Sequence, residues 1–276
     1  MVLIEPDRRA TLRDVAHLAG VSTKTASRVV NGEAGVVPAK VDAVLAAIAE
    51  LDYRRDMTAS SLRRSDGRTA ALAAILEDLA NPYSAEVHRA LENVARDRGV
   101  LIFAGSIDED PEREHQLVQE FTARRADALV IMSASDHHGH LERELRGTPA
   151  VFVDRPPIGF AADAVLTDNT TGVRRGVEHL LAAGHRRIAY LGDQLSIATA
   201  RQRYDGFLDA MSAAGLAASP RSVATGLHGQ GTSEAAVRAL LNLDDPPTAL
   251  FCAQNNVTLA ALRVLAVTVL GLRRRQ

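Results

Sequence analysis

Residues 11–36 read TLRDVAHLAGVSTKTASRVVNGEAGV, and this stretch decides the fold of the first part of the chain. Its apolar residues recur at helical spacing in two bursts, 12–19 and 26–30. Between them stand Gly20, which suits the end of a helix, Val21, which can fill the space between two helices, and Ser22, a good amino-terminal cap. Such a tight corner predicts a helix-turn-helix, and a further apolar burst at 41–51 predicts a third helix.

From residue 70 onward, short apolar runs alternate with amphipathic stretches. Examples are ALAAILE at 71–77, VLIFAGS at 100–106, RIAYLGD at 187–193 and TALFCA at 248–253. Strands that alternate with helices predict βαβ units and a mainly parallel sheet. We therefore expect a doubly wound α/β body that binds its ligand at the carboxyl ends of the strands.

A polar, cationic segment separates these two patterns. Residues 54–68 read RRDMTASSLRRSDGR, in which Met57 and Leu62 are the large apolar residues. This composition is typical of a hinge or linker. A chain of 276 residues has room for a small domain and a large one. We expect a small helical head with its hinge at 1–64 and a larger ligand-binding α/β body at 65–276.

Composition excludes several classes of protein. The chain is 46% hydrophobic and 24% charged, as in ordinary globular proteins. Its longest uncharged apolar stretch, at 264–272, has nine residues, far fewer than the ~20 that span a bilayer. The first residues lack a secretory signal pattern, and the single Cys252 cannot form an internal disulfide, so we expect a cytoplasmic protein without a membrane partner. Phosphate-loop and nucleophile-elbow motifs are absent, which disfavours an enzyme.

The 11–36 stretch resembles the DNA-binding head of the LacI family of transcriptional repressors. It carries Thr-Leu-x-Asp-Val-Ala, then Ala-Gly-Val-Ser, then Thr-x-Ser-Arg-Val-Val-Asn. The resemblance continues over almost the whole chain, through NPYSAEV, DEDPERE, VDRP, DNTTG, GHRRIAYLG, TARQRYDGF and DPPTALF. It implies a two-lobed body like that of periplasmic binding proteins, a homodimer on a pseudo-palindromic operator, a sugar-like effector and no cofactor.

The second predicted helix has a polar outer face, because Ala26, Val29 and Val30 face inward. The resemblance implies that Thr23, Lys24 and Arg28 on the outer face read base edges in the major groove. The other polar residues of the head are better placed for phosphates or helix caps. The candidate DNA contacts are Thr11, Ser22, Thr23, Lys24, Thr25, Ser27, Arg28, Asn31 and, in the hinge, Leu62. The alternative is a solvated polar helix face.

The hinge departs from the family pattern. The resemblance implies that Leu62 from each of two subunits wedges into the minor groove, and the alternative is a leucine that packs on the body. Arg55, Asp56 and Ser60 stand where Pro, Asn and Arg are common, and an anionic Asp56 near phosphate is expected to weaken binding slightly. Val37 replaces the Ser or Thr that usually caps the third helix, although Pro38 is compatible with a helix start.

Matching by motif also gives candidate effector contacts near the ends of predicted strands. They are Asn81, Tyr83, Ser133, Asp154, Arg203 and Asn255. A carboxylate, a guanidinium, amides and one aromatic ring suit a hydroxyl-rich ligand such as a sugar. The alternatives without a ligand role are a turn at Asn81, a strand-end cap at Asp154 and a surface ion pair at Arg203.

Two clusters of titratable residues do not have the spacing of a metal or catalytic site. His137, His138 and His140 lie in a loop, HHGH, without the spacing of a zinc site, so we interpret them as solvated and expect no metal. Four acids at 109–114 surround Pro111 at the start of a predicted helix, where acids favour the helix dipole.

The chain stops early relative to the family pattern. After the helix predicted at 257–270, the usual Val-Pro pair and Gly-Phe-Asp-Asp strand do not follow, and Asn256 replaces a common Asp. We expect a truncated repressor with an impaired effector response. The rival hypotheses are an effector-insensitive repressor, a sugar-binding module with a vestigial head, and an enzyme on the same α/β body.

Overall fold

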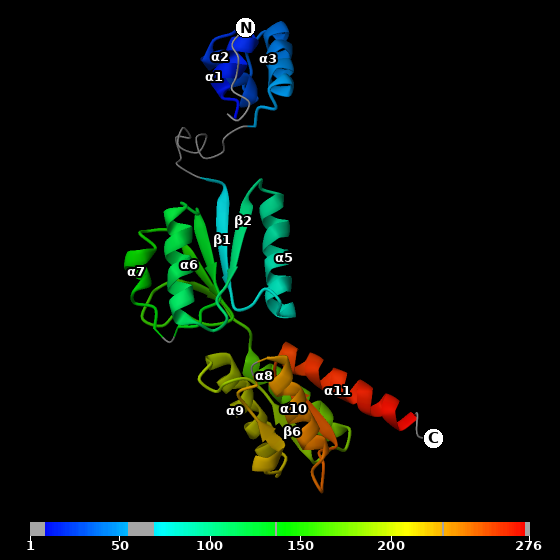
Figure 1. Ribbon diagram of the computed structural model, residues 1–276. Coiled ribbons are helices and arrows are strands. Elements are labelled where there is room, and N and C mark those ends of the chain that lie inside the picture. Colours follow the sequence, from blue (N-terminus) through cyan, green and yellow to red (C-terminus); the bar gives the residue numbers. More distant parts are fainter. Residues whose placement is uncertain (1–8, 55–68, 136, 228, 274–276) are drawn as a thin grey trace. The chain divides into compact units, whose positions relative to one another are not determined.

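The computed structural model describes residues 9–54, 69–135, 137–227 and 229–273 (Figure 1). The chain divides into two compact units, 1–69 and 70–276, and each is described by itself. Among the described helices, none is both long enough and apolar enough to cross a bilayer.

The first unit is a small three-helix domain built from α1 (Leu12–Leu18), α2 (Thr23–Val30) and α3 (Pro38–Glu50). Gly20, at φ +62°, turns the chain between α1 and α2, because a residue with a side chain rarely adopts that conformation. The three helices share one apolar core, and its fully buried members are Val15, Ala16, Ala26, Val44 and Ala47. The predicted helix-turn-helix is confirmed.

Caps fix where these helices begin. Thr11 and Asp14 form a capping box on α1, in which the Asp14 amide donates to the Thr11 hydroxyl at 3.3 Å and the Asp14 carboxylate accepts from the Thr11 amide at 2.8 Å. Ser22 caps α2. Val37 makes no side-chain cap on α3, and Pro38 begins that helix instead, as the sequence indicates.

The second unit has two parallel sheets with helices on both faces. The first sheet has the strand order β2-β1-β3-β4-β5, and the second has the order β7-β6-β8. The strands are β1 (Ala71–Leu76), β2 (Leu101–Ser106), β3 (Ala128–Ile131), β4 (Ala150–Val153), β5 (Asp163–Val165), β6 (Ile188–Leu191), β7 (Val223–Ala224) and β8 (Ala249–Cys252). The helices are α5 (Pro82–Arg96), α6 (Pro111–Ala123), α7 (Leu141–Glu144), α8 (Asn169–Ala182), α9 (Ala198–Ala213), η1 (Pro220–Ser222), α10 (Gln230–Leu241) and α11 (Asn255–Arg273).

Alternate residues of each central strand point to opposite faces and build separate cores. On β1, Ala73 and Ile75 pack with α6 and α7, whereas Ala74 and Leu76 pack with α5. On β6, the same alternation separates a core with α10 and α11 from a core with α8 and α9. The predicted doubly wound α/β fold is confirmed.

Candidate functional site

The outer face of α2 forms a shallow polar hollow. Thr23, Lys24, Ser27 and Arg28 line it together with Glu33 from the following loop. Thr23 and Lys24 are exposed, whereas Arg28 is partly buried. The three side chains that the sequence assigns to base reading therefore share one face, of the kind that a major groove accepts.

Arg28 is held by the loop that follows α2. Its Nη2 donates to the Ala34 carbonyl at 2.5 Å, and its Nε lies 3.4 Å from a carboxylate oxygen of Glu33. Glu33 also accepts a 3.2 Å hydrogen bond from the Asn31 side chain. These contacts orient the guanidinium of Arg28. Glu33 was not among the residues predicted from the sequence.

The other predicted head residues have local partners. The Ser22 hydroxyl accepts from the Thr25 amide at 3.1 Å, and the two hydroxyls lie 2.9 Å apart. Asn31 is the residue that ends α2. Ser22 and Asn31 are thus the caps of α2, a role that is compatible with phosphate contacts. Leu62 and the hinge departures at Arg55, Asp56 and Ser60 lie outside the described residues.

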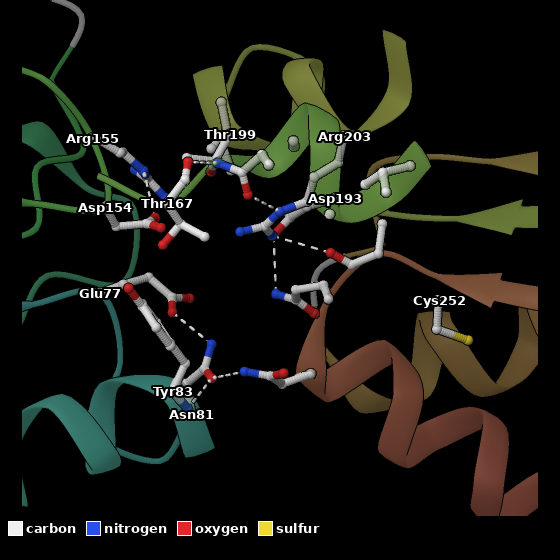
Figure 2. A pocket seen from close by; sticks show the side chains of 18 of the residues that line it. Glu77, Asn81, Tyr83, Asp154, Arg155, Thr167, Asp193, Thr199, Arg203 and Cys252 are labelled. Atoms are coloured by element: carbon white, nitrogen blue, oxygen red, sulfur yellow. Dashed lines mark hydrogen bonds and ion pairs between the residues drawn. The ribbon is translucent and has the colours of Figure 1, made fainter. Parts of the chain in front are cut away.

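In the second unit, a cavity of about 390 Å³ opens at the carboxyl ends of strands from both sheets (Figure 2). Its lining includes the predicted Asn81, Tyr83, Asp154, Arg203 and Asn255. The structure therefore gathers five of the six predicted effector residues around one cavity. We refer to it below as the cleft.

On the side of the second sheet, the cleft is lined by a hydrogen-bonded set of polar groups. Arg203 donates from Nε to the Asn169 side chain at 2.7 Å and from Nη1 to the Ala253 carbonyl at 3.1 Å. Gln254 donates to a carboxylate oxygen of Asp193 at 3.1 Å. These contacts fix the guanidinium of Arg203 at the cleft (Figure 2), so its role there is not that of a surface ion pair.

On the side of the first sheet, three acids and an arginine line the cleft, namely Glu77, Glu109, Asp154 and Arg155. Arg155 makes a two-pronged ion pair with Glu109, at 2.7 and 2.5 Å, and both side chains are largely buried. Glu77 accepts from the Asn81 amide at 2.8 Å. The pKa of Glu77 is raised from 4.5 to about 7, chiefly by burial. The hydrogen bond from Asn81 opposes this rise, and the neighbouring carboxylates of Glu109 and Asp78 add to it.

Asp154 has a strained backbone where β4 ends. Its φ is +70°, a conformation that residues other than glycine seldom adopt, and its amide donates to the Val165 carbonyl on the neighbouring strand at 3.0 Å. Such strain is characteristic of ligand sites. It places Asp154 and Arg155 together at the cleft.

Ser133 does not belong to the lining. Its side chain is buried, and its hydroxyl donates to Glu114 at 2.8 Å and contacts His138 Nε2 at 2.6 Å. The other ring nitrogen, Nδ1, accepts from the Ile158 amide at 2.8 Å, so Nε2 carries the proton and donates to Ser133. This direction is opposite to that of a nucleophile whose proton a histidine removes. The cluster of Ser133, Glu114 and His138 therefore holds the loop that follows β3 in place.

Two sequence interpretations are corrected by the same cluster. His138 is not solvated but buried, edge-on against Phe152 with ring centroids 4.9 Å apart. Burial lowers the pKa of His138. Glu114 is fully buried and also accepts from the amides of Ala134 and Ser135, so it does far more than complement a helix dipole.

Several residues at the cleft were not among the effector contacts predicted from the sequence. They are Glu77, Glu109, Arg155, Asp168, Asn169, Asp193, Thr199 and Gln254. Four of them, Glu77, Arg155, Asp193 and Gln254, stand within two residues of the end of a strand, and that position was the signal that could have found them.

A helix-turn-helix unit joined in one chain to a doubly wound body with a polar cleft is the plan of a regulator with separate DNA-binding and effector-binding domains. Comparison with known proteins agrees. Residues 11–56 match the lacI family of bacterial regulatory proteins, and residues 69–269 match the periplasmic binding proteins and sugar binding domain of the LacI family. The chain belongs to the LacI family.

Named relatives are transcriptional regulators. The chain is 30% identical to the HTH-type transcriptional repressor PurR of Mannheimia succiniciproducens over 96% of this chain and 78% of the relative. The lac repressor dimer bound to operator and the anti-inducer ONPF has a TM-score of 0.78 at 27% identity, covering 95% of this chain and 78% of that one. The complex of the transcriptional regulator CelR with cellobiose has a TM-score of 0.61 at 29% identity, covering 94% and 79%.

Proposed function

We propose that this protein is an operator-binding transcriptional repressor that acts as a homodimer in the cytoplasm and is controlled by a small hydroxyl-rich molecule, most simply a sugar. Residues 1–64 form the DNA-binding head with its hinge, and 65–276 form the effector-binding and dimerising body. The single observation that carries the proposal is the exposed polar face of α2, on which Thr23, Lys24 and Arg28 stand together in a capped helix-turn-helix.

Base reading by this face has a direct test. Sites bound by the full chain are selected from a random duplex pool, and affinity for the winning pseudo-palindrome is compared with affinity for random duplex at several salt concentrations. Arg28→Ala is expected to lower the preference by about 1–3 kcal/mol, because a bidentate contact to guanine is lost. Arg174→Ala is the control, because Arg174 is an exposed arginine on α8. Equal affinity of the wild type for both duplexes would refute the proposal and leave a sugar-binding module with a vestigial head.

The cleft supports the effector half of the proposal. Asp154 and Arg203 offer an acceptor and a donor for hydroxyl groups, and Tyr83 offers a ring face. The similar CelR structure, with its cellobiose, favours a sugar. Candidate sugars are screened by the rise in the unfolding temperature of the full chain.

Two arginines on α9 provide the matched pair for this screen. Arg203→Ala is expected to abolish the stabilisation by the sugar that the screen identifies. Arg201→Ala is expected to retain it, because Arg201 is exposed, bonds the Leu195 carbonyl and does not line the cleft. If the wild type binds its operator but no sugar stabilises it or releases the operator, the protein is an effector-insensitive repressor.

A dimer follows from symmetry, since one head contacts few bases and a palindromic site presents two equal halves. An apolar patch at the edge of the first sheet supports self-association. Leu101 and Phe103 on the edge strand β2 are 65% and 44% exposed, and Val94 on α5 is 54% exposed. Sedimentation of the full chain is expected to give twice the monomer mass, and Phe103→Glu is expected to shift the mass toward the monomer.

A further inference from the structure

Three potential metal ligands converge on the α6 side of the first sheet. His115 lies on α6, His140 directly precedes α7, and Glu144 ends α7. One ligand atom from each lies within 4.8 Å of the other two, and all three residues are partly buried. None of them lines the cleft, so the cluster is independent of the proposed effector site.

The carboxylate of Glu144 is only half satisfied. One oxygen, Oε1, lies 2.8 Å from Nδ1 of His115. The other, Oε2, is buried and has no hydrogen-bond partner among the described residues. A buried carboxylate oxygen without a donor is unfavourable, and a cation beside it would remove that cost.

The two imidazole rings face the same small volume. The ring centroids of His115 and His140 lie 5.9 Å apart, at an interplanar angle of 54°. His137, in the same loop as His140, has a different role, because its Nδ1 accepts from the Gly139 amide at 3.2 Å. The cluster therefore takes only His140 from the histidine-rich loop, and its second imidazole, His115, comes from α6.

Gln119, one turn after His115 on α6, is placed to orient the ligand. Its side-chain amide lies 2.9 Å from Nε2 of His115. The oxygen and nitrogen of an amide exchange by a simple flip. Without an ion, Nδ1 of His115 donates to Glu144 and Nε2 accepts from Gln119. When an ion binds Nδ1, the ring proton resides on Nε2, which then donates to the flipped Gln119 oxygen, and the lone pair of Nδ1 is free for the ion. Metal-bound histidines usually have such a second hydrogen bond.

We propose that His115, His140 and Glu144 bind a transition-metal ion of the Zn²⁺ type. Two imidazoles and one carboxylate form a donor set that suits zinc, and Mg²⁺ and Ca²⁺ prefer oxygen ligands alone. Ligands of a tetrahedral zinc lie about 3.4 Å from one another. The present spread of 4.8 Å therefore requires only a small closure by side-chain rotation. The bound ion joins α6 to α7 and leaves a fourth position for water.

Isothermal titration of the untagged, full-length protein with Zn²⁺ tests the site. One equivalent is expected to bind and to raise the unfolding temperature. His115→Gln, His140→Gln and Glu144→Gln are each expected to weaken binding by at least about tenfold, and Gln119→Ala by roughly tenfold through loss of orientation. His179→Gln is the matched control, because His179 is an exposed histidine on α8.

The outcomes that overturn the proposal are distinct. One is absence of saturable Zn²⁺ binding to the wild type, and another is unchanged binding in the His115→Gln variant. Loss of binding in His137→Gln with retention in His115→Gln would place the ion in the loop alone. Titration of the wild type with Co²⁺ is a test that does not depend on the folding of any variant. Strong visible absorption bands of a four-coordinate ion are expected, and their absence also refutes the site.

Discussion

The side-chain amide of Asn255 donates a 3.2 Å hydrogen bond to the side-chain oxygen of Asn81, although 174 positions separate the two residues. Asn81 is the cap of α5 and Asn255 is the first residue of α11, so the bond joins two helix starts at the cleft. The same Asn81 oxygen accepts from the Tyr83 amide at 3.0 Å, and the Asn81 nitrogen donates to Glu77 at 2.8 Å. Asn81 is thus the shared member of three contacts.

Removal of this shared member is expected to destabilise the body. Asn81→Ala deletes the helix cap and leaves Glu77 without its donor, which together lower the free energy of unfolding by about 1–2 kcal/mol. Asn255→Ala deletes only the part-buried bond between the two helix starts, and about 0.5 kcal/mol is expected. Urea unfolding of both variants measures the difference. Equal losses would contradict the capping role of Asn81.

The helices, the strands and part of the cleft could be predicted from the sequence, for a physical reason. Hydrophobic periodicity is local, so the helices of the head and the strands of both sheets were predicted from it. Asn81, Asp154 and Arg203 were found because they stand in segments with a family pattern and line the cleft. The assignment of DNA and effector contacts to individual side chains stays a prediction.

Contacts between distant segments were out of reach. Ser133 follows a strand, as a cleft residue would, but its hydroxyl turns to Glu114, nineteen positions earlier. His138 stands in a polar HHGH loop and is nevertheless buried against Phe152. Neither orientation is encoded in local spacing, because each depends on where α6 and β4 pack against the loop.

Glu77 is expected to make stability depend on pH. Its pKa rises from 4.5 to about 7 on folding, mainly through burial, so the folded state holds this proton more tightly than the unfolded state. The contribution to stability is fully present below pH 4.5 and is lost as pH rises through about 7.

Unfolding of Glu77→Gln across that pH range measures the effect. The variant cannot ionise and can still accept the bond from Asn81, so its stability is expected to fall less than that of the wild type between pH 5 and pH 7.5. Glu86→Gln, an exposed change on α5, serves as the control and is expected to follow the wild type. If the stability of Glu77→Gln falls with pH as steeply as that of the wild type, the pH dependence belongs to other groups.

Among the acidic residues on the helices that cover the first sheet, Glu114 is the one whose substitution is expected to lower stability most. It accepts from the Ser133 hydroxyl and from the amides of Ala134 and Ser135, all in a buried setting. Glu114→Gln places an NH₂ group among donors, and a loss of about 3 kcal/mol in unfolding free energy is expected. Glu112→Gln, an exposed change in the same helical turn, is expected to cost less than about 0.5 kcal/mol. Similar losses in both variants would show that burial of Glu114 contributes little.

Glu33 is expected to set the balance between specific and non-specific DNA binding, on the proposal that α2 reads the operator. Its carboxylate pairs with Arg28 at 3.4 Å and lines the same hollow as Lys24. Glu33→Gln removes an anion that repels phosphates, so affinity for any duplex is expected to rise by about threefold to tenfold at low salt. Arg28 also loses one of the partners that orient it, so the ratio of operator to random affinity is expected to fall.

Anisotropy titrations with operator and random duplexes, repeated across salt concentrations, separate these two effects of Glu33→Gln. Glu50→Gln, an exposed change at the end of α3, controls for the simple loss of one negative charge in the head. A rise in random affinity that Glu50→Gln reproduces would reflect net charge alone. A fall in the affinity ratio found only in Glu33→Gln ties specificity to the orientation of Arg28. An unchanged ratio would mean that Arg28 finds its base without help from Glu33.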